Sequence, residues 1–114
     1  WNMLHPQEKP RLSYVEECLN GAIGPVIAAT DYMKVYADQI REFVSVHYSV
    51  LGTDGFGRSD TRERLRKFFE VDRYYITVAA LSALAQENVI DAAQVTKAIE
   101  LYGIDPGKPD PVTL

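Results

Sequence analysis

Apolar residues follow two different spacings along this chain, and the first of them predicts strands. One continuous apolar run occupies residues 25–30, and a second occupies residues 48–51 immediately before a glycine-rich loop. Short continuous runs of this kind are typical of strands buried in a parallel sheet. Because a helical pattern separates the two runs, we predict a parallel, right-handed β-α-β unit.

The second spacing predicts helices. The helix between the strands is expected to begin at Thr30 or Asp31, as its N-cap, and to run to about Val44. A shorter helix before the first strand begins at Ser13, with Glu16 completing a capping box. Apolar residues recur at helical spacing in the helix between the strands and predict a buried stripe made of Met33, Tyr36, Ala37, Ile40, Phe43 and Val44.

Three further helices are predicted after the glycine-rich loop. Residues 61–69 form a short, strongly charged helix. Residues 73–86, capped by Asp72, are apolar nearly all round, so this helix should be largely buried. The last helix is capped by Asp91 and closed by Gly103. The fold class is therefore α/β, part of a three-layer sandwich with a mostly parallel sheet and with helices at its C-terminal end.

The number of predicted strands is too small for a complete sheet. A buried parallel sheet needs cover on both faces and at least a third strand. The missing strands are therefore expected from sequence upstream of this chain or from another chain. Residue 1 is Trp rather than Met, so we also expect the chain to begin inside a longer protein.

Composition narrows the functional class. The chain has 114 residues, of which 46% are hydrophobic and 25% charged, as in an ordinary globular domain. Its formal net charge of −4 argues against a nucleic-acid or anionic-membrane partner, and also against a helix-turn-helix role for the last three helices. The single Cys18 excludes an internal disulfide and favours a reducing, cytoplasmic setting. No apolar run approaches the ~20 residues that span a bilayer.

The glycine-rich loop is the best-defined candidate site. It follows a strand and precedes a helix, at the edge where open α/β sheets build functional sites. It lacks the lysine and hydroxyl of a Walker loop, and its glycines do not have dinucleotide-binding spacing. We expect a structural loop or one that shapes an entrance, with positive φ at one or both loop glycines, an inward-pointing aromatic ring, and an aspartate that caps the next helix. The residues concerned are Thr53, Asp54, Gly55, Phe56, Gly57, Arg58 and Asp60.

The other polar candidates are open to more than one interpretation. Asp31 and Tyr32 follow a strand end and are candidate contacts there, although a helix cap also explains Asp31. A basic cluster beside the loop either receives an anion or forms a solvated helical face with ion pairs to Asp60, Glu63 and Glu70, and we favour the second. The members of this cluster are Arg58, Arg62, Arg64, Arg66 and Lys67.

We predict no catalytic, cofactor-binding or metal-binding residue in this chain. His5 and His47 lack carboxylate or hydroxyl partners nearby in the sequence, and Cys18 lies beside glutamates that disfavour a thiolate. Asp54-Gly55 followed by Asn88 superficially matches a thiamine diphosphate signature, but its first glycine is replaced by threonine and the asparagine is not doubled.

Three segments carry a resemblance to a known family. They are WNMLHPQEKPR at 1–11, GPVIAATDYMKVYADQIREFV at 24–44 and YSVLGTDGFGRSDTRERLRKFFEVDRYYITVAAL at 48–81. The motifs TDYM, LGTDGFGRSD and FFEVD occur in these segments in the same order as at the C-terminal end of the homodimeric pyruvate dehydrogenase decarboxylating components. That family belongs to the transketolase-like thiamine diphosphate superfamily.

The resemblance implies a role for the chain within a larger enzyme. Family members have three α/β domains per subunit, and their cofactor lies between the first domain of one subunit and the second domain of the other. This chain resembles the later part of the third domain, with residues 1–12 as a connector, 13–104 as domain and 105–114 as a tail. The implied parent oxidatively decarboxylates pyruvate with thiamine diphosphate and Mg²⁺ and acetylates lipoyl groups of the dihydrolipoyl acetyltransferase component.

The resemblance therefore implies an architectural segment that binds no cofactor itself. Its expected partners are the N-terminal and middle domains and the second subunit of a homodimer. The alternative is an independent α/β anion-binding or regulatory module that uses the loop from Gly52 to Asp60.

Overall fold

The computed structural model describes residues 1–55 and 57–113, and its centre is a pair of parallel strands. Strand β1 (Val26–Ala29) pairs with strand β2 (Tyr48–Leu51) in parallel, and Val26 lies opposite Tyr48. The ladder is extended at one end by Val26 N–H, which donates to the carbonyl of His47 over 2.8 Å. The predicted parallel β-α-β unit is confirmed.

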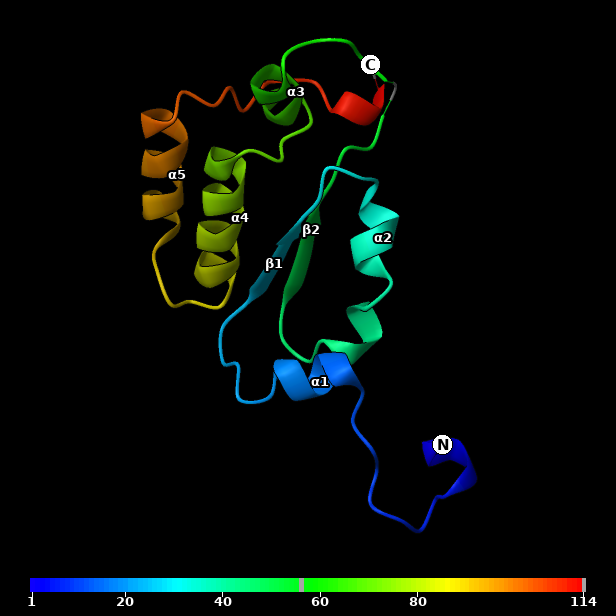
Figure 1. The fold of residues 1–114 in the computed structure, drawn as a ribbon. Helices are drawn as coiled ribbons and strands as arrows, with labels where there is room; N and C mark the ends of the chain where they lie inside the picture. Colours follow the sequence, from blue (N-terminus) through cyan, green and yellow to red (C-terminus); the bar gives the residue numbers. More distant parts are fainter. Residues whose placement is uncertain (56, 114) are drawn as a thin grey trace.

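Helices lie on both sides of this strand pair. Helix α2 (Lys34–Asp38) packs against β2, whereas α4 (Arg73–Gln86) packs against β1 and against α5 (Ala92–Leu101). Figure 1 shows α2 on one side of the strands and α4 with α5 on the other. The arrangement is the α/β class that the sequence predicts, as part of a three-layer sandwich. The remaining elements are η1 (Asn2–Leu4), α1 (Tyr14–Cys18), η2 (Arg41–Phe43), α3 (Arg62–Phe68) and η3 (Pro111–Thr113).

The sheet is small and has two open edges. Among residues 1–55 and 57–113, β1 and β2 are the only strands that form a sheet. An open edge presents backbone N–H and C=O groups that could pair with a further strand. The expectation that further strands come from upstream sequence or from another chain stays a prediction. In the part of the chain described here, no helix combines the length and apolar character needed to cross a bilayer.

The prediction of one continuous helix from Thr30 or Asp31 to Val44 is wrong. Only Lys34–Asp38 is α-helical, and a separate 3-10 turn, η2, follows it. At the start, the Thr30 hydroxyl accepts from the Tyr32 N–H over 3.0 Å and stabilises a turn instead of a cap. At the end, the Tyr48 hydroxyl donates to the Ala37 carbonyl over 2.6 Å. The carbonyl that would continue the helix is therefore bonded to the neighbouring strand.

The predicted buried stripe of this helix is also wrong in most of its positions. Val44 is buried, but four of the larger side chains remain exposed to solvent. Their exposed fractions are 54% for Met33, 60% for Tyr36, 36% for Ile40 and 37% for Phe43. The stripe has helical spacing, yet the described residues provide no surface that covers it.

Helix α4 is less buried than its sequence predicts. It is apolar on nearly all sides, but within α4, which is described throughout, Ala83 alone is fully buried. Among the described elements, the main contacts of α4 are with β1 and α5. The hydrophobic core of the described residues consists of Val44, Tyr48, Val71, Ala83 and Ala98, each at most 9% exposed.

Most of the predicted helix caps are confirmed. Ser13 and Glu16 form the reciprocal capping box of α1. The Asp72 carboxylate accepts from two N–H groups at the start of α4, and Asp91 caps α5. Besides the cap predicted at Thr30 or Asp31, the one predicted at Asp60 is wrong, because α3 is capped by Thr61. Thr61 is one residue closer to the helix, so its hydroxyl reaches the Arg64 N–H over 3.3 Å.

Residues 1–12 form an arm that is held by contacts between its own residues. The Asn2 side chain donates to the Arg11 carbonyl over 2.9 Å and accepts from the Arg11 N–H over 2.8 Å. The Arg11 guanidinium lies 3.7 Å from the centre of the Trp1 ring, which also stacks on His5. Figure 1 shows this arm extending away from the sheet and helices.

The Asp72 cap provides a test of the fold. Asp72→Ala removes the acceptor for the Tyr74 and Tyr75 N–H groups, so we expect the free energy of unfolding to fall by about 1 kcal/mol. Asp72→Asn retains a side-chain oxygen and should lose less. Urea unfolding followed by circular dichroism measures both variants. Equal losses for both variants would mean that the charge, rather than the hydrogen bonds, stabilises this end of α4.

Candidate functional site

The two sets of polar residues predicted at the strand ends form one cluster. The Thr53 N–H donates to the Tyr32 carbonyl over 2.9 Å, and the Thr53 hydroxyl donates to the Asp31 carbonyl over 2.7 Å. Because β1 and β2 are parallel, the segments that follow them meet at the same edge of the sheet. The structure therefore joins the loop to Asp31 and Tyr32 through the backbone of those two residues.

Asp54 caps α2 from the neighbouring loop. Its Oδ1 atom accepts from the Lys34 N–H over 3.0 Å. Gly52 allows the close approach, since a Cβ atom at this position would lie 2.8 Å from Lys34 N and 2.9 Å from the Tyr32 carbonyl oxygen. The loop after β2 thus supplies the cap that the residues preceding α2 do not.

Gly55 is the loop glycine with the strictest requirement. Its φ is +129°, and a Cβ atom there would lie 2.7 Å from the Pro111 carbonyl oxygen. A Cβ atom at Gly57 would meet no described atom within 4 Å, so the constraint that we predicted at one or both glycines falls on Gly55. The predicted inward orientation of Phe56 lies outside the described residues.

The charged residues of the loop contact neighbouring side chains. The Arg58 guanidinium lies 4.1 Å from the centre of the Phe68 ring. Asp60 accepts from the Thr61 N–H over 2.7 Å and lies 3.9 Å from Arg64, which confirms one predicted ion pair. These contacts hold the loop against α3, as expected for a structural loop.

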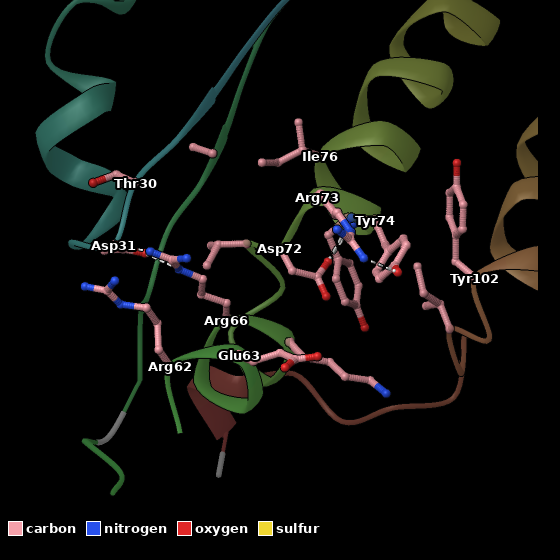
Figure 2. Close-up of a pocket in the computed structure, with 15 residues that line it drawn as sticks. Thr30, Asp31, Arg62, Glu63, Arg66, Asp72, Arg73, Tyr74, Ile76 and Tyr102 are labelled. Carbon is pink, nitrogen blue, oxygen red and sulfur yellow. Dashed lines mark hydrogen bonds and ion pairs between the residues drawn. The ribbon is translucent and has the colours of Figure 1, made fainter. Parts of the chain in front are cut away.

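A cavity of about 850 Å³ opens where β1 ends (Figure 2). Its floor is formed by residues 29–31, and its walls come from α3, the start of α4 and the end of α5. On one side Arg66 makes two hydrogen bonds to the Asp31 carboxylate, of 3.2 and 3.4 Å. On the other side Arg73 donates to the Tyr74 hydroxyl over 2.8 Å, and the Tyr74 ring lies 4.9 Å from that of Tyr102.

The charges around this cavity nearly cancel. The basic residues that line it are Arg62, Arg66, Lys67 and Arg73, and the acidic ones are Asp31, Glu63 and Asp72. Asp31 and Arg66 are both well exposed, so their ion pair stabilises the fold only slightly. The basic cluster therefore does not create a strongly positive surface. Of the two interpretations of this cluster, the geometry favours a solvated helical face.

One predicted ion pair of this cluster is replaced. Glu70 was expected to pair with a cation of its own helix, but it lies 3.4 Å from Lys108. No sequence signal indicated Lys108 as a partner, because it lies in a proline-rich segment 38 residues away. A contact between residues this far apart depends on the tertiary fold, and the spacing of neighbouring residues in the sequence does not predict it.

The two histidines and the cysteine lie in three different parts of the chain. His5 Nδ1 lies 2.8 Å from the Trp1 carbonyl oxygen, and Cys18 is exposed on α1. His47 does have a hydroxyl partner, contrary to expectation, since its Nε2 atom lies 2.9 Å from Ser49 Oγ. Within residues 1–55 and 57–113, His, Cys, Asp and Glu side chains nowhere gather in a group of three that could hold a metal ion.

Tyr75, in the cavity wall, gives a pH-dependent prediction. Burial raises the pKa of its phenol above the ordinary 10.0, and the nearby carboxylates of Glu70, Asp72 and Asp105 raise it further. The folded state therefore favours the neutral phenol, so stability is fully present below pH 10.0 and is lost as the pH rises through the folded pKa.

We expect Tyr75→Phe to lose less stability than the unchanged chain between about pH 9 and about pH 11. Urea midpoints measured across that range provide the test. Parallel curves for the two proteins would show that Tyr75 ionises equally easily in the folded and unfolded states.

Comparison with known proteins identifies the family. The sequence profile described as the transketolase-like TK C-terminal domain matches residues 1–72. The pyruvate dehydrogenase E1 component of Pseudomonas aeruginosa is 62% identical over 113 residues, covering 98% of this chain and 13% of that protein. The E1 component of Cupriavidus necator is 59% identical over 114 residues, covering 100% and 13%.

The corresponding Escherichia coli protein is 53% identical over 112 residues, which cover 97% of this chain and 12% of that protein. The aligned segments make up 13% and 12% of these relatives, so the chain spans about one-eighth of their length. The predicted resemblance is confirmed, and the chain belongs to the transketolase-like C-terminal domain family.

Proposed function

We propose that this chain is the C-terminal part of a pyruvate dehydrogenase E1 component and that its role there is architectural. The identity of 62% over 98% of the chain supports the parent enzyme. An architectural role means that the segment packs against the N-terminal and middle domains and against the second subunit of a homodimer. The proposed division of the chain is a connector at 1–12, a domain at 13–104 and a tail at 105–114.

The observation that carries the architectural role is a set of exposed apolar side chains along residues 32–43, the segment that contains α2 and η2. We call it the α2 face and define it as Tyr32, Met33, Tyr36, Ile40 and Phe43. Tyr32 is 71% exposed, and its ring lies 6.0 Å from that of Tyr36, in an edge-to-face arrangement. Apolar side chains placed at helical spacing but left in water are typical of a surface that another part of a protein covers.

The chemistry of the parent enzyme is assigned to the domains outside this chain. We propose that the parent decarboxylates pyruvate with thiamine diphosphate and Mg²⁺ and reductively acetylates a lipoyl group of the dihydrolipoyl acetyltransferase component, whose disulfide is reduced as the two-carbon unit is oxidised to acetyl. The residues present here do not fit the cofactor. The Asp54 carboxylate is occupied as the α2 cap, and Asn88 lies beyond the far end of α4. We further propose that the parent is cytoplasmic and acts in glycolytic metabolism, and the free Cys18 agrees with a reducing compartment.

The alternative, an independent anion-binding module built on the loop from Gly52 to Asp60, has less support. Thr53 donates both its N–H and its hydroxyl to carbonyls before α2, and Arg58 lies over the Phe68 ring. These donors are thus engaged in packing the loop, and the Asp54 carboxylate would repel an anion. The neighbouring cavity has nearly balanced charges, so it offers no strong attraction either.

The α2 face predicts self-association of the isolated chain. Exposed apolar side chains and two open strand edges favour contact between molecules, so we expect the sedimentation coefficient to rise with protein concentration. Tyr36→Lys places a charge in the face and should reduce this association. Tyr14→Lys is a matched control, because Tyr14 is 80% exposed but lies on α1. A monomer with a sharp, concentration-independent thermal transition would contradict the proposal.

A second prediction concerns the cofactor. Because the described residues contain no group of three metal ligands and the Asp54 carboxylate caps α2, we expect no heat of binding when thiamine diphosphate and Mg²⁺ are titrated into the isolated chain. We likewise expect it not to decarboxylate pyruvate. The full-length parent enzyme, titrated under the same conditions, is the positive control. Micromolar binding to the isolated chain would overturn the assignment of the cofactor site to the other domains.

A further inference from the structure

We propose that segment 105–113 positions the start of α2, and with it the α2 face, through the turn at Asp54 and Gly55. The segment contacts this turn, and the turn caps α2. The coupling is carried entirely by contacts among described residues. Only its functional meaning, control of a docking surface, rests on the architectural role proposed above.

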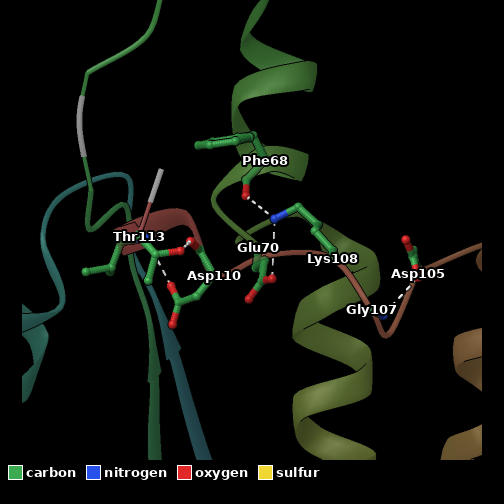
Figure 3. Close-up of polar contacts among 8 residues, drawn as sticks. Phe68, Glu70, Asp105, Gly107, Lys108, Asp110 and Thr113 are labelled. Carbon is green, nitrogen blue, oxygen red and sulfur yellow. Dashed lines mark hydrogen bonds and ion pairs between the residues drawn. The ribbon is translucent and has the colours of Figure 1, made fainter.

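Lys108 anchors the segment to the end of α3 (Figure 3). Its Nζ atom donates to the Phe68 carbonyl over 2.7 Å and to the Glu70 carboxylate over 3.4 Å. The last carbonyls of a helix have no partner within the helix, and the Lys108 ammonium satisfies one of them with a charged donor. The Lys108 side chain is only 22% exposed, so this contact is better shielded than the other ion pairs of the chain.

A short turn beyond Lys108 reaches Gly55. The Thr113 N–H and hydroxyl both donate to the Asp110 carbonyl, over 2.9 and 2.7 Å, and close the turn η3. Pro111, within this turn, is buried. Its carbonyl oxygen would lie 2.7 Å from a Cβ atom at Gly55, so the two backbones touch with no room for a side chain.

The turn at Gly55 is continuous with the cap of α2. Asp54, the preceding residue, accepts from the Lys34 N–H over 3.0 Å. Helix α2 has five residues and no capping side chain from its own N-cap, Met33, among the described bonds. A helix this short is not stable by itself and depends on tertiary contacts. A shift of Gly55 therefore weakens the contact that holds the first turn of α2.

Hydrogen exchange in the full-length parent enzyme tests the coupling. Lys108→Met keeps the aliphatic stem but removes the ammonium, and Gly55→Ala places a methyl group against Pro111. The matched controls are Lys97→Met on the exposed side of α5 and Gly57→Ala, where a Cβ atom meets no described atom within 4 Å. Mass spectrometry of peptides covering residues 31–38 and 105–113 reports the exchange of each segment.

We expect both test variants to speed exchange in residues 31–38 by roughly five- to tenfold, because one hydrogen bond to the first turn is weakened. The controls should leave that peptide unchanged. Faster exchange confined to residues 105–113 would overturn the proposal, as would an equal effect of the controls. Exchange in residues 31–38 could become faster while the thermal stability and subunit association of the parent stay unchanged. That result would support the coupling but contradict the docking role of the α2 face.

Discussion

The rest of this structure depends on the hydrogen bonds between the loop after β2 and the residues at the start of α2. Asp54 accepts from the Lys34 N–H, and Thr53 bonds to the carbonyls of Asp31 and Tyr32. These bonds join the segments that follow the two parallel strands, so they hold the edge of the sheet and the helix that crosses between the strands in one unit. Gly52 makes this possible because any side chain there would strike the backbone of α2.

This arrangement gives the polar residues at the sheet edge partners within the chain. In many open α/β sheets the carboxyl ends of the strands present polar groups to a ligand. Here those groups bond to one another or to neighbouring backbone. The cavity beside them is lined by charges of both signs and has two tyrosine rings in its wall. It therefore resembles a junction between packed elements more than a site that concentrates one kind of ligand.

The chain leaves a large part of its apolar surface in water. Its two strands have open edges, α4 is covered on two sides, and the α2 face lies in solvent. Folding of a small domain leaves only a narrow margin of stability, and here few side chains are fully buried. Since the related E1 components are about eight times longer, as the 13% coverage shows, the missing cover is expected from the rest of such a polypeptide.

The features that local sequence determines were predicted well. Both strands, the Ser13–Glu16 capping box and the caps at Asp72 and Asp91 follow from residue type and spacing, because each depends on groups within a few residues of one another. The pairing of the strands joins residues 22 positions apart, and it was predicted because a helical segment between two strands favours a parallel crossover. The sequence also identified the family, because the motifs TDYM, LGTDGFGRSD and FFEVD occur in this chain in the order that is typical of the family.

Tertiary structure decided what depends on distant partners. The helix after β1 ends early where the Tyr48 hydroxyl donates a hydrogen bond to the Ala37 carbonyl. The start of this helix is capped by Asp54, which lies twenty residues after Lys34 in the sequence. The strict requirement for glycine falls on Gly55 because Pro111 packs against it from the far end of the chain. Spacing alone predicted that the stripe on α2 would be buried. Whether it is covered depends on which surfaces are present, and the described residues do not include the one that covers it.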